Sequence, residues 1–473
     1  MNRSVRRRGR TSRATALGAA ALVLAPLAAA RTSGAVARPV PARSATSSAA
    51  GEWTTYGGSP SRTSAQPASP PLLPLRRRWT SARLDGPVYG EPLVLSGLVY
   101  VATESDSVYA LRAATGAVAW RRSIGVPAPA SLLPCGDISP VVGVTSTMVL
   151  DPANGTLLVS AETSRSGAVH HVLVALDART GALRWERDLD QPGWTASAQL
   201  QRAALALDAG RVLVGFGGNY GDCSTYHGWL LAVPESGVGP TLSYRVPTAR
   251  EGAIWGPSGV AVGPTGDVLV ATGNGSSSTT YDHGDSVIEL DPGLRPVGYF
   301  APVDWASLNS SDADLGSTGP MLLSDGRVVQ VGKGGVAYLL DSSRLGGIGG
   351  EVARLSTCFA IGGDAYLAPF AYLPCVDGSL EAVLVGTSAL RPGWTAAPVD
   401  GASPTVAAGV VWTLGNPGHL LGTAARTGRV VVDLPVVPVE HYAAPAAGDG
   451  LLVVAGTSRV EAFAGPRGLV LAP

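Results

Sequence analysis

Short runs of β-branched residues recur along most of the chain, and this repetition constrains the fold more than any other feature. Seven such runs stand out: residues 98–102 (LVYVA), 157–161 (LLVSA), 212–216 (VLVGF), 268–272 (VLVAT), 328–332 (VVQVG), 410–414 (VVWTL) and 451–455 (LLVVA). Repeats of about 40 residues that hold about four strands each are typical of a β-propeller. The sequence therefore predicts an all-β fold.

A second motif follows several of these runs with constant spacing. Thr-Gly-x-x-x-Trp ends both residues 109–120 (YALRAATGAVAW) and 174–185 (VALDARTGALRW), and residues 421–432 repeat it with Val432 in place of Trp. Glycine after threonine suits a hairpin turn with positive φ. We expect each Trp to pack between neighbouring sheets as a large apolar plug.

The number of runs predicts about eight blades, with seven as the alternative. Longer insertions interrupt the pattern at 120–145, 217–228, 274–284 and 303–319. Residues 75–84 read as the last strand of a blade whose other strands come from 451–465. We therefore expect the two ends of the domain to pair and close the ring, which removes an exposed sheet edge.

Composition excludes several classes of protein. Of the 473 residues, 45% are hydrophobic and only 15% charged, which is unlike a disordered chain. The balance of 35 basic and 35 acidic residues argues against a nucleic-acid binder. All but one of the basic residues are Arg, so the single lysine, Lys333, draws attention.

The first 37 residues have the pattern of an export signal. Six arginines precede the apolar stretch 14–30, and Ala-x-Ala sites follow it. We expect general secretion, with twin-arginine export as the alternative, and no lipid anchor because no cysteine is near. Residues 38–51 read as a disordered lead-in, and 52–473 as one propeller domain without a membrane span. Removing the leader leaves a net charge of −7.

Four cysteines remain, and an even number in an exported chain favours two disulfides. We take Cys135–Cys223 and Cys358–Cys375 as the working pairing, although spacing alone does not determine it. No CxxCH motif occurs, which excludes covalently attached c-type haem.

Between about residues 53 and 465 the chain resembles the pyrroloquinoline-quinone (PQQ) repeat family. This family includes eight-bladed quinoprotein alcohol dehydrogenases, polyvinyl-alcohol dehydrogenases and non-catalytic propellers of outer-membrane assembly. The Thr-Gly-x-x-x-Trp unit indicates the architecture but not catalysis, because the non-catalytic members share it.

The resemblance implies roles for five residues. Residues 252–262 (GAIWGPSGVAV) resemble the segment whose Trp underlies the quinone, which gives that role to Trp255, and the TGN turn gives Asn274 a calcium-binding role. Residues 312–320 (DADLGSTGP) make Asp314 the catalytic base and a metal-binding residue, and 331–341 (VGKGGVAYLLD) make Lys333 the quinone contact. More distantly, 159–177 make Glu162 a calcium ligand.

The same five residues have plain structural alternatives. Trp255 could be an inter-blade plug, Asn274 a turn residue, and Asp314 a hairpin end. The family's quinone also stacks on a disulfide between adjacent cysteines, whereas Gly136 follows Cys135 here. Two functions therefore stay open at this point.

The first function is an exported PQQ- and Ca²⁺-dependent dehydrogenase that oxidises a small or polymeric hydroxyl substrate and passes electrons to a separate acceptor. The alternative is a non-catalytic scaffold that binds an extracytoplasmic protein or cell-envelope ligand. Convergence of the five side chains on one cavity at the propeller axis would distinguish the two.

Overall fold

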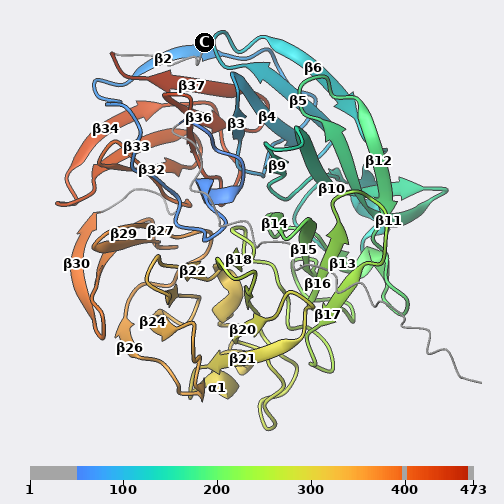
Figure 1. Ribbon diagram of the computed structural model, residues 1–473, viewed down its shortest axis with the longest axis vertical. Helices are drawn as coiled ribbons and strands as arrows, with labels where there is room; N and C mark the ends of the chain where they lie inside the picture. The colour runs from blue at the N-terminus through green and yellow to red at the C-terminus, as the bar shows by residue number, and fades with distance from the viewer. Residues whose placement is uncertain (1–50, 397–401, 467–473) are drawn as a thin grey trace, which may run out of the picture. The chain divides into compact units, whose positions relative to one another are not determined.

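Eight sheets stand around a common axis and form a β-propeller, as the repeats predicted (Figure 1). The computed structural model describes residues 51–396 and 402–466. The predicted leader (1–37), nearly all of the predicted lead-in (38–51) and the last residues of the predicted domain lie outside these ranges. Within them, no helix is long and apolar enough to cross a membrane.

Each blade is an antiparallel sheet whose strands follow the chain from the inside outward. The first four blades comprise β3 (Leu93–Leu95), β4 (Leu98–Thr103), β5 (Ser107–Arg112) and β6 (Val118–Ser123); β9 (Val149–Asp151), β10 (Thr156–Arg165), β11 (Ala168–Asp177) and β12 (Leu183–Asp188); β13 (Gln199–Leu200), β14 (Ala206–Asp208), β15 (Arg211–Gly218), β16 (Trp229–Pro234) and β17 (Leu242–Arg245); and β18 (Ala261–Val262), β19 (Val268–Ala271), β20 (Val287–Leu290) and β21 (Pro296–Ala301), with β25 (Gly347–Ile348) added in parallel.

The remaining four blades repeat this plan. They comprise β22 (Met321–Leu322), β23 (Arg327–Gln330), β24 (Val336–Asp341) and β26 (Ala353–Ser356); β27 (Ala365–Leu367), β28 (Phe370–Pro374), β29 (Leu380–Val385) and β30 (Leu390–Ala396); β31 (Thr405–Ala407), β32 (Val410–Gly415), β33 (His419–Ala424) and β34 (Val430–Pro435), with β1 (Ala65–Gln66) added in parallel; and β35 (Ala446–Gly448), β36 (Leu451–Ala455), β37 (Val460–Ala464) and β2 (Arg76–Thr80).

Burial explains why the central strands read as continuous apolar runs. In β36 and β37 every residue is buried, because both faces of a blade pack against neighbouring blades. The outermost strands, such as β6, carry mostly exposed or half-buried residues. The core is therefore a set of layers between blades.

The Thr-Gly-x-x-x-Trp motif joins one blade to the next, as predicted. Trp120, on β6, donates from Nε1 to the carbonyl of Ala178 in the following blade at 3.0 Å. Its ring covers Gly181, whose φ is +70°. Trp185 makes the equivalent bond to Glu235 at 3.1 Å. The motif therefore sets both a turn and an inter-blade contact.

The ring closes between the two ends of the domain, which confirms the prediction from residues 75–84. Strand β2 pairs antiparallel with β37, so the last blade takes its outer strand from the beginning of the chain. Trp79 then donates to the carbonyl of Ala113 at 2.7 Å, which continues the same inter-blade contact across the junction.

Residues 51–66 form an inner ring that contacts every blade in turn. The backbone of this segment bonds to Asp449, Val94, Leu150, Val262, Leu322, Tyr366 and Val406, and the Arg62 side chain reaches Leu205 in the third blade. Figure 1 shows this segment, in blue, at the centre of the propeller. No repeat predicted it.

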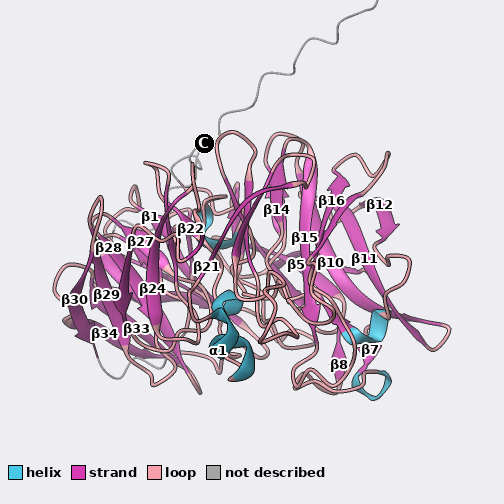
Figure 2. Cartoon of the chain, turned by 90° about the horizontal axis from the view of Figure 1, so that it is seen from below, coloured by secondary structure: helices cyan, strands magenta, loops and turns pink. Residues whose placement is uncertain are grey.

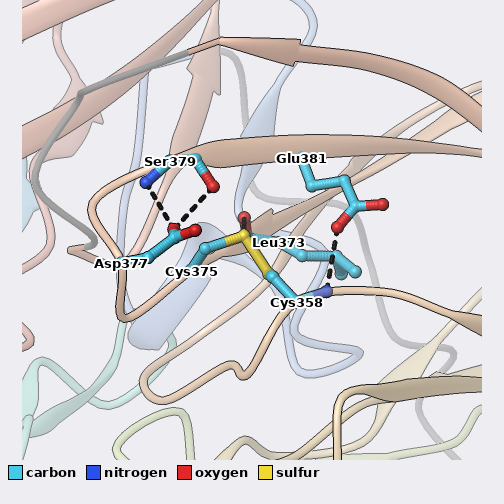
Figure 3. Close-up of a disulfide and its surroundings, with 6 residues drawn as sticks. All are labelled: Cys358, Leu373, Cys375, Asp377, Ser379 and Glu381. Atoms are coloured by element: carbon cyan, nitrogen blue, oxygen red, sulfur yellow. Dashed lines mark hydrogen bonds between the residues drawn. A yellow bond between two sulfur atoms is a disulfide. The ribbon is translucent and has the colours of Figure 1, made fainter.

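Both disulfides of the working pairing are present. Cys135–Cys223 joins the insertion after β6 to the loop after β15. Cys358–Cys375 lies beside β28, where Glu381 accepts a bond from the Cys358 amide at 2.9 Å (Figure 3). In the side view, helix α1 (Trp305–Ser310) and the β7–β8 hairpin (Ala128–Pro129 and Val141–Val142) lie toward the same face of the ring (Figure 2).

Candidate functional site

Four of the five predicted site residues come from consecutive connections in the middle of the chain. Trp255 lies between β17 and β18, Asn274 follows β19, Asp314 lies between α1 and β22, and Lys333 lies between β23 and β24. The four residues lie on different loops, but contacts link each of them to at least one of the others.

An ion pair is the centre of the group. The Nζ of Lys333 lies 2.6 Å from Oδ2 of Asp314, and the backbone amide of Lys333 donates to the Asp314 carbonyl at 3.0 Å. Both side chains are largely buried, with 15% and 10% of their surfaces exposed. The two segments are therefore fixed to each other by side chain and backbone.

Asn274 links this ion pair to a second carboxylate. Its backbone amide donates to Oδ1 of Asp314 at 2.7 Å, and its Nδ2 donates to Oδ1 of Asp312 at 2.8 Å. Asp312 also lies 3.2 Å from the Lys333 ammonium. The Oδ1 atom of Asn274 is buried and has no hydrogen-bond partner among the described residues. An acceptor in this state could bind a cation or a donor on a ligand.

Trp255 borders the ion pair. The Lys333 ammonium lies 5.5 Å from the centroid of the indole, within the range of a cation–π contact. Gly273 lies close to both Asp314 and Trp255: an added Cβ would lie 2.4 Å from Asp314 Oδ1 and 3.1 Å from Trp255 Nε1. Only glycine lets the chain approach both side chains so closely.

Burial and charge act in opposite directions on the two members of the ion pair. Burial raises the pKa of Asp314, and the lowering by the Lys333 ammonium and the Asn274 amide does not cancel it. Burial lowers the pKa of Lys333, but the carboxylates of Asp314 and Asp312 outweigh it and the net shift is upward. A lysine held charged beside a carboxyl of raised pKa suits an electrophilic group next to a base.

Neighbouring carboxyl and amide groups hold the loops of the site in place. Oδ1 of Asp285 accepts from the Leu315 amide at 2.8 Å, directly after Asp314. Oδ1 of Asn309, on α1, accepts from the Gly275 amide at 2.8 Å, directly after Asn274. These bonds restrict the positions that Asp314 and Asn274 can adopt.

Glu162 does not join the other four. It lies on β10 with 1% of its surface exposed, and neither carboxyl oxygen has a hydrogen-bond partner among the described residues. Burial raises its pKa well above the usual value, and the charges of Glu104, Asp106 and Asp190 raise it further. No described contact connects it to Asp314 or Lys333, and its role as a metal ligand stays a prediction.

Sequence reasoning missed one member of this group, Asp312, and a separate charged residue, Arg202. Asp312 contacts both Lys333 and Asn274, and its place two residues before Asp314 in DADLG was the only signal for it. Arg202 lines a pocket together with Pro257, which follows Trp255 by two residues. A single charged residue just before a short inner strand gave no pattern to recognise.

Comparison with known proteins supports the fold and the repeat type. Residues 76–221 match the family described as outer membrane protein assembly factor BamB. Polyvinylalcohol dehydrogenases of Sphingopyxis sp. (strain 113P3) and Pseudomonas sp. are each 27% identical to the chain, over 239 and 238 residues. The matched stretch is 46% of this chain and 34% of each relative, so it spans about a third of the relatives' length.

Solved structures show the same architecture over most of the chain. The quinohemoprotein alcohol dehydrogenase of Comamonas testosteroni superposes with a TM-score of 0.67 at 17% identity, covering 89% of this chain and 81% of that one. A europium-containing methanol dehydrogenase gives 0.69 at 13% identity, covering 88% and 99%. BamB of Moraxella catarrhalis gives 0.57 at 16% identity, covering 83% and 98%. At these identities the likeness concerns the fold.

The repeated turn motif, the ring of eight sheets and these similarities agree with one another: the chain is an eight-bladed β-propeller that resembles PQQ-repeat proteins.

Proposed function

We propose that this chain is an exported, PQQ- and Ca²⁺-dependent dehydrogenase that oxidises an alcohol or a sugar-like hydroxyl, on a small or a polymeric substrate. The observation that carries the proposal is the buried Asp314–Lys333 pair beside the half-buried indole of Trp255. The similarity to dehydrogenases, which covers part of the chain, supports the same conclusion.

The residues fit such a cofactor in three respects. PQQ is a flat tricycle with three carboxylates, and the indole of Trp255 offers it an aromatic surface. The Lys333 ammonium offers a donor to an oxygen of the quinone. The unpartnered Oδ1 of Asn274, near two carboxylates, offers the oxygen ligands that Ca²⁺ prefers.

When bound, the quinone supplies an acceptor for the hydride that leaves the alcohol carbon. The protein's part is the proton: Oδ2 of Asp314 would accept it from the substrate hydroxyl, so that one carbonyl product, one proton and one hydride balance the oxidation. The raised pKa makes the carboxylate of Asp314 a stronger base than that of an ordinary aspartate. Lys333 would stay charged and orient the oxygens around it. Electrons would then pass to a separate acceptor.

Titration of the purified chain with PQQ in the presence of Ca²⁺ tests the proposal. We expect quinone absorbance to stay with the protein and the unfolding temperature to rise with cofactor concentration, because a ligand of the native state stabilises it. Loss of both effects in EGTA would confirm the need for the cation. An unchanged unfolding temperature at saturating PQQ and Ca²⁺ would contradict the proposal and favour a scaffold.

Asp314→Asn and Lys333→Gln separate chemistry from binding. Asp314→Asn keeps an acceptor for the Asn274 amide but removes the base, so we expect PQQ binding to persist while dye-linked alcohol oxidation falls about 10²–10⁴-fold. Lys333→Gln should lower the activity and, unlike Asp314→Asn, should also weaken PQQ binding. Arg122→Gln, an exposed arginine on β6, is the matched control and should leave both unchanged. Equal activity of Asp314→Asn and wild type would exclude Asp314 as the base.

A further inference from the structure

Arg202 is a buried arginine whose guanidinium makes no hydrogen bond or ion pair with another described residue. Only 9% of the residue is exposed, and its Nε is buried without a partner. Buried polar groups are nearly always bonded, and an unpaired buried charge is costly. A guanidinium in this state therefore requires an explanation.

Arg62 shows what the fold does with a buried arginine whose role is structural. Its guanidinium donates to four oxygens of the protein: the carbonyls of Val260, Tyr56 and Leu205 and the hydroxyl of Thr55, at 2.8–3.1 Å. The chain thus surrounds one buried guanidinium with acceptors, whereas the other has none among the described residues. The contrast indicates that the acceptor for Arg202 comes from outside the chain.

Two tyrosine rings hold the Arg202 guanidinium in place. Its Cζ lies 5.0 Å from the ring centroid of Tyr442 and 5.7 Å from that of Tyr89. Rings of this kind favour the positive charge without using the N–H donors. A planar guanidinium fixed by its faces keeps its edge for a planar, bidentate acceptor, which is the geometry of a carboxylate.

Arg202, Tyr89 and Tyr442 line one pocket near the centre of the propeller, together with Glu91, Thr147 and Pro257. Burial lowers the pKa of Arg202 and the charges of Asp137 and Glu104 act to raise it, but neither carboxylate forms an ion pair with it. Burial raises the pKa of Glu91 to about 8, so this carboxyl is mostly neutral at pH 7 and does not repel an anion. The pocket therefore presents a net positive charge to a small group.

We propose that Arg202 binds the carboxylate of an organic ligand in this pocket. The inference does not rest on the quinone proposal, because it concerns a different cation and is tested with acetate alone. The carboxylate belongs either to PQQ or to a separate ligand, and the experiment below distinguishes the two sources.

Acetate binding to the full chain is the primary test, with NaCl at equal ionic strength as the reference. We expect acetate to raise the unfolding temperature in a saturable way and to broaden the ¹³C line of labelled acetate. Arg202→Gln should weaken the apparent affinity about tenfold or more, and Arg202→Lys should recover part of it because the charge returns without the planar fork. The exposed Arg122→Gln should match wild type.

Three results would overturn the proposal. They are equal effects of acetate and chloride, equal acetate affinity of Arg202→Gln and wild type, and binding of acetate to wild type only at molar concentration. A folding defect should not hide the answer, because the Arg202 guanidinium makes no hydrogen bond or ion pair with other described residues that its replacement would break. We expect Arg202→Gln to unfold at the same temperature as wild type or higher when acetate is absent.

A PQQ titration of the same variants identifies the source of the carboxylate. If Arg202→Gln loses affinity for both acetate and PQQ, the group bound is a carboxylate of the cofactor. If it loses acetate but keeps PQQ, the pocket serves a separate carboxylate ligand. If wild type binds acetate but no PQQ at all, the quinone proposal fails and the carboxylate site stands.

Discussion

Several carboxyl groups in the described part of the chain are buried with few or no hydrogen bonds, and burial raises their pKa values. Burial raises the pKa of Asp364 to about 8, and neither of its oxygens has a hydrogen-bond partner among the described residues. Burial likewise raises the pKa values of Glu91 and Asp106 to about 8 and that of Glu104 to about 7. The native state therefore keeps protons that the unfolded chain releases near pH 4.

We predict that the free energy of unfolding falls as pH rises from about 4.5 to 8. The unfolded state binds fewer protons than the native state in this range, so the slope of stability with pH is negative. Asp364→Asn replaces one of these carboxyls with an amide that does not titrate. It should raise the free energy of unfolding at pH 8 by roughly 2 kcal/mol and change it little at pH 4. Urea unfolding in EDTA at pH 4, 6 and 8 measures this. The exposed Glu186→Gln is the control, and a flat or rising wild-type profile would contradict the prediction.

Site residues could be predicted from the sequence only where they lie in a recognisable motif. Lys333, Asp314, Asn274 and Trp255 each lie in a segment that resembles the family, and the structure brings them into contact. Glu162 was assigned from a longer and looser segment, and it lies among other carboxyls instead. Arg202 lies in no recognised motif. Its significance comes from the lack of hydrogen bonds to other described residues, which a sequence does not record.

At the scale of elements, the contact between a tryptophan and the next blade's glycine is the repeated unit of assembly. Trp120 of β6 covers Gly181 of the following blade, where an added Cβ would meet the ring at 2.6 Å. Gly181 and Gly210 share nearly the same φ, +70° and +76°, but an added Cβ at Gly210 would meet nothing within 4 Å. Alanine substitutions at Gly181 and Gly210 therefore separate the free-energy cost of the left-handed turn from that of the contact with the indole.

Gly181→Ala should therefore destabilise the protein more than Gly210→Ala does. Both variants carry the backbone cost of a left-handed turn, about 1 kcal/mol, whereas only Gly181→Ala also displaces an indole, at about 1–3 kcal/mol. Chemical denaturation of both variants gives the difference, and a red shift of tryptophan emission should accompany only Gly181→Ala. Equal losses would mean that the indole contact contributes nothing measurable.

The same elements show which parts of a blade a sequence can reveal. The two central strands and the turn of a blade were predictable because burial on both faces produces apolar runs and the turn needs glycine. The innermost strands, such as β18 and β22, hold only two residues each and are too short to show a period. Two of the four insertions form α1 and the β7–β8 hairpin, which lie toward one face and follow no repeat.

At the scale of the molecule, the ring is closed twice. Strand β2 pairs with β37 at the outer edge, and residues 51–66 bond to the inner strand region of all eight blades. The first closure was predictable, because a blade without its first strands needs a partner. The second was not, since backbone carbonyls make most of its contacts and any residue carries a carbonyl.

Arg62 is the side chain that fixes this inner ring, and its loss should weaken the whole propeller. The guanidinium spans residues 55–62 of the inner ring and the third and fourth blades, through carbonyls that would otherwise be buried without donors. We predict that Arg62→Met lowers the free energy of unfolding by about 3 kcal/mol or more. The exposed Arg122→Met is the matched control and should change it by less than about 0.5 kcal/mol.

Hydrogen exchange shows whether the effect of Arg62→Met is global. If the inner ring holds the blades together, amides of all eight inner strands should exchange faster, including those of blades that Arg62 does not touch, because the blades open as one unit. Faster exchange confined to the third and fourth blades would mean that Arg62 supports only its neighbours. In that case the outer pairing of β2 with β37 would alone keep the ring closed.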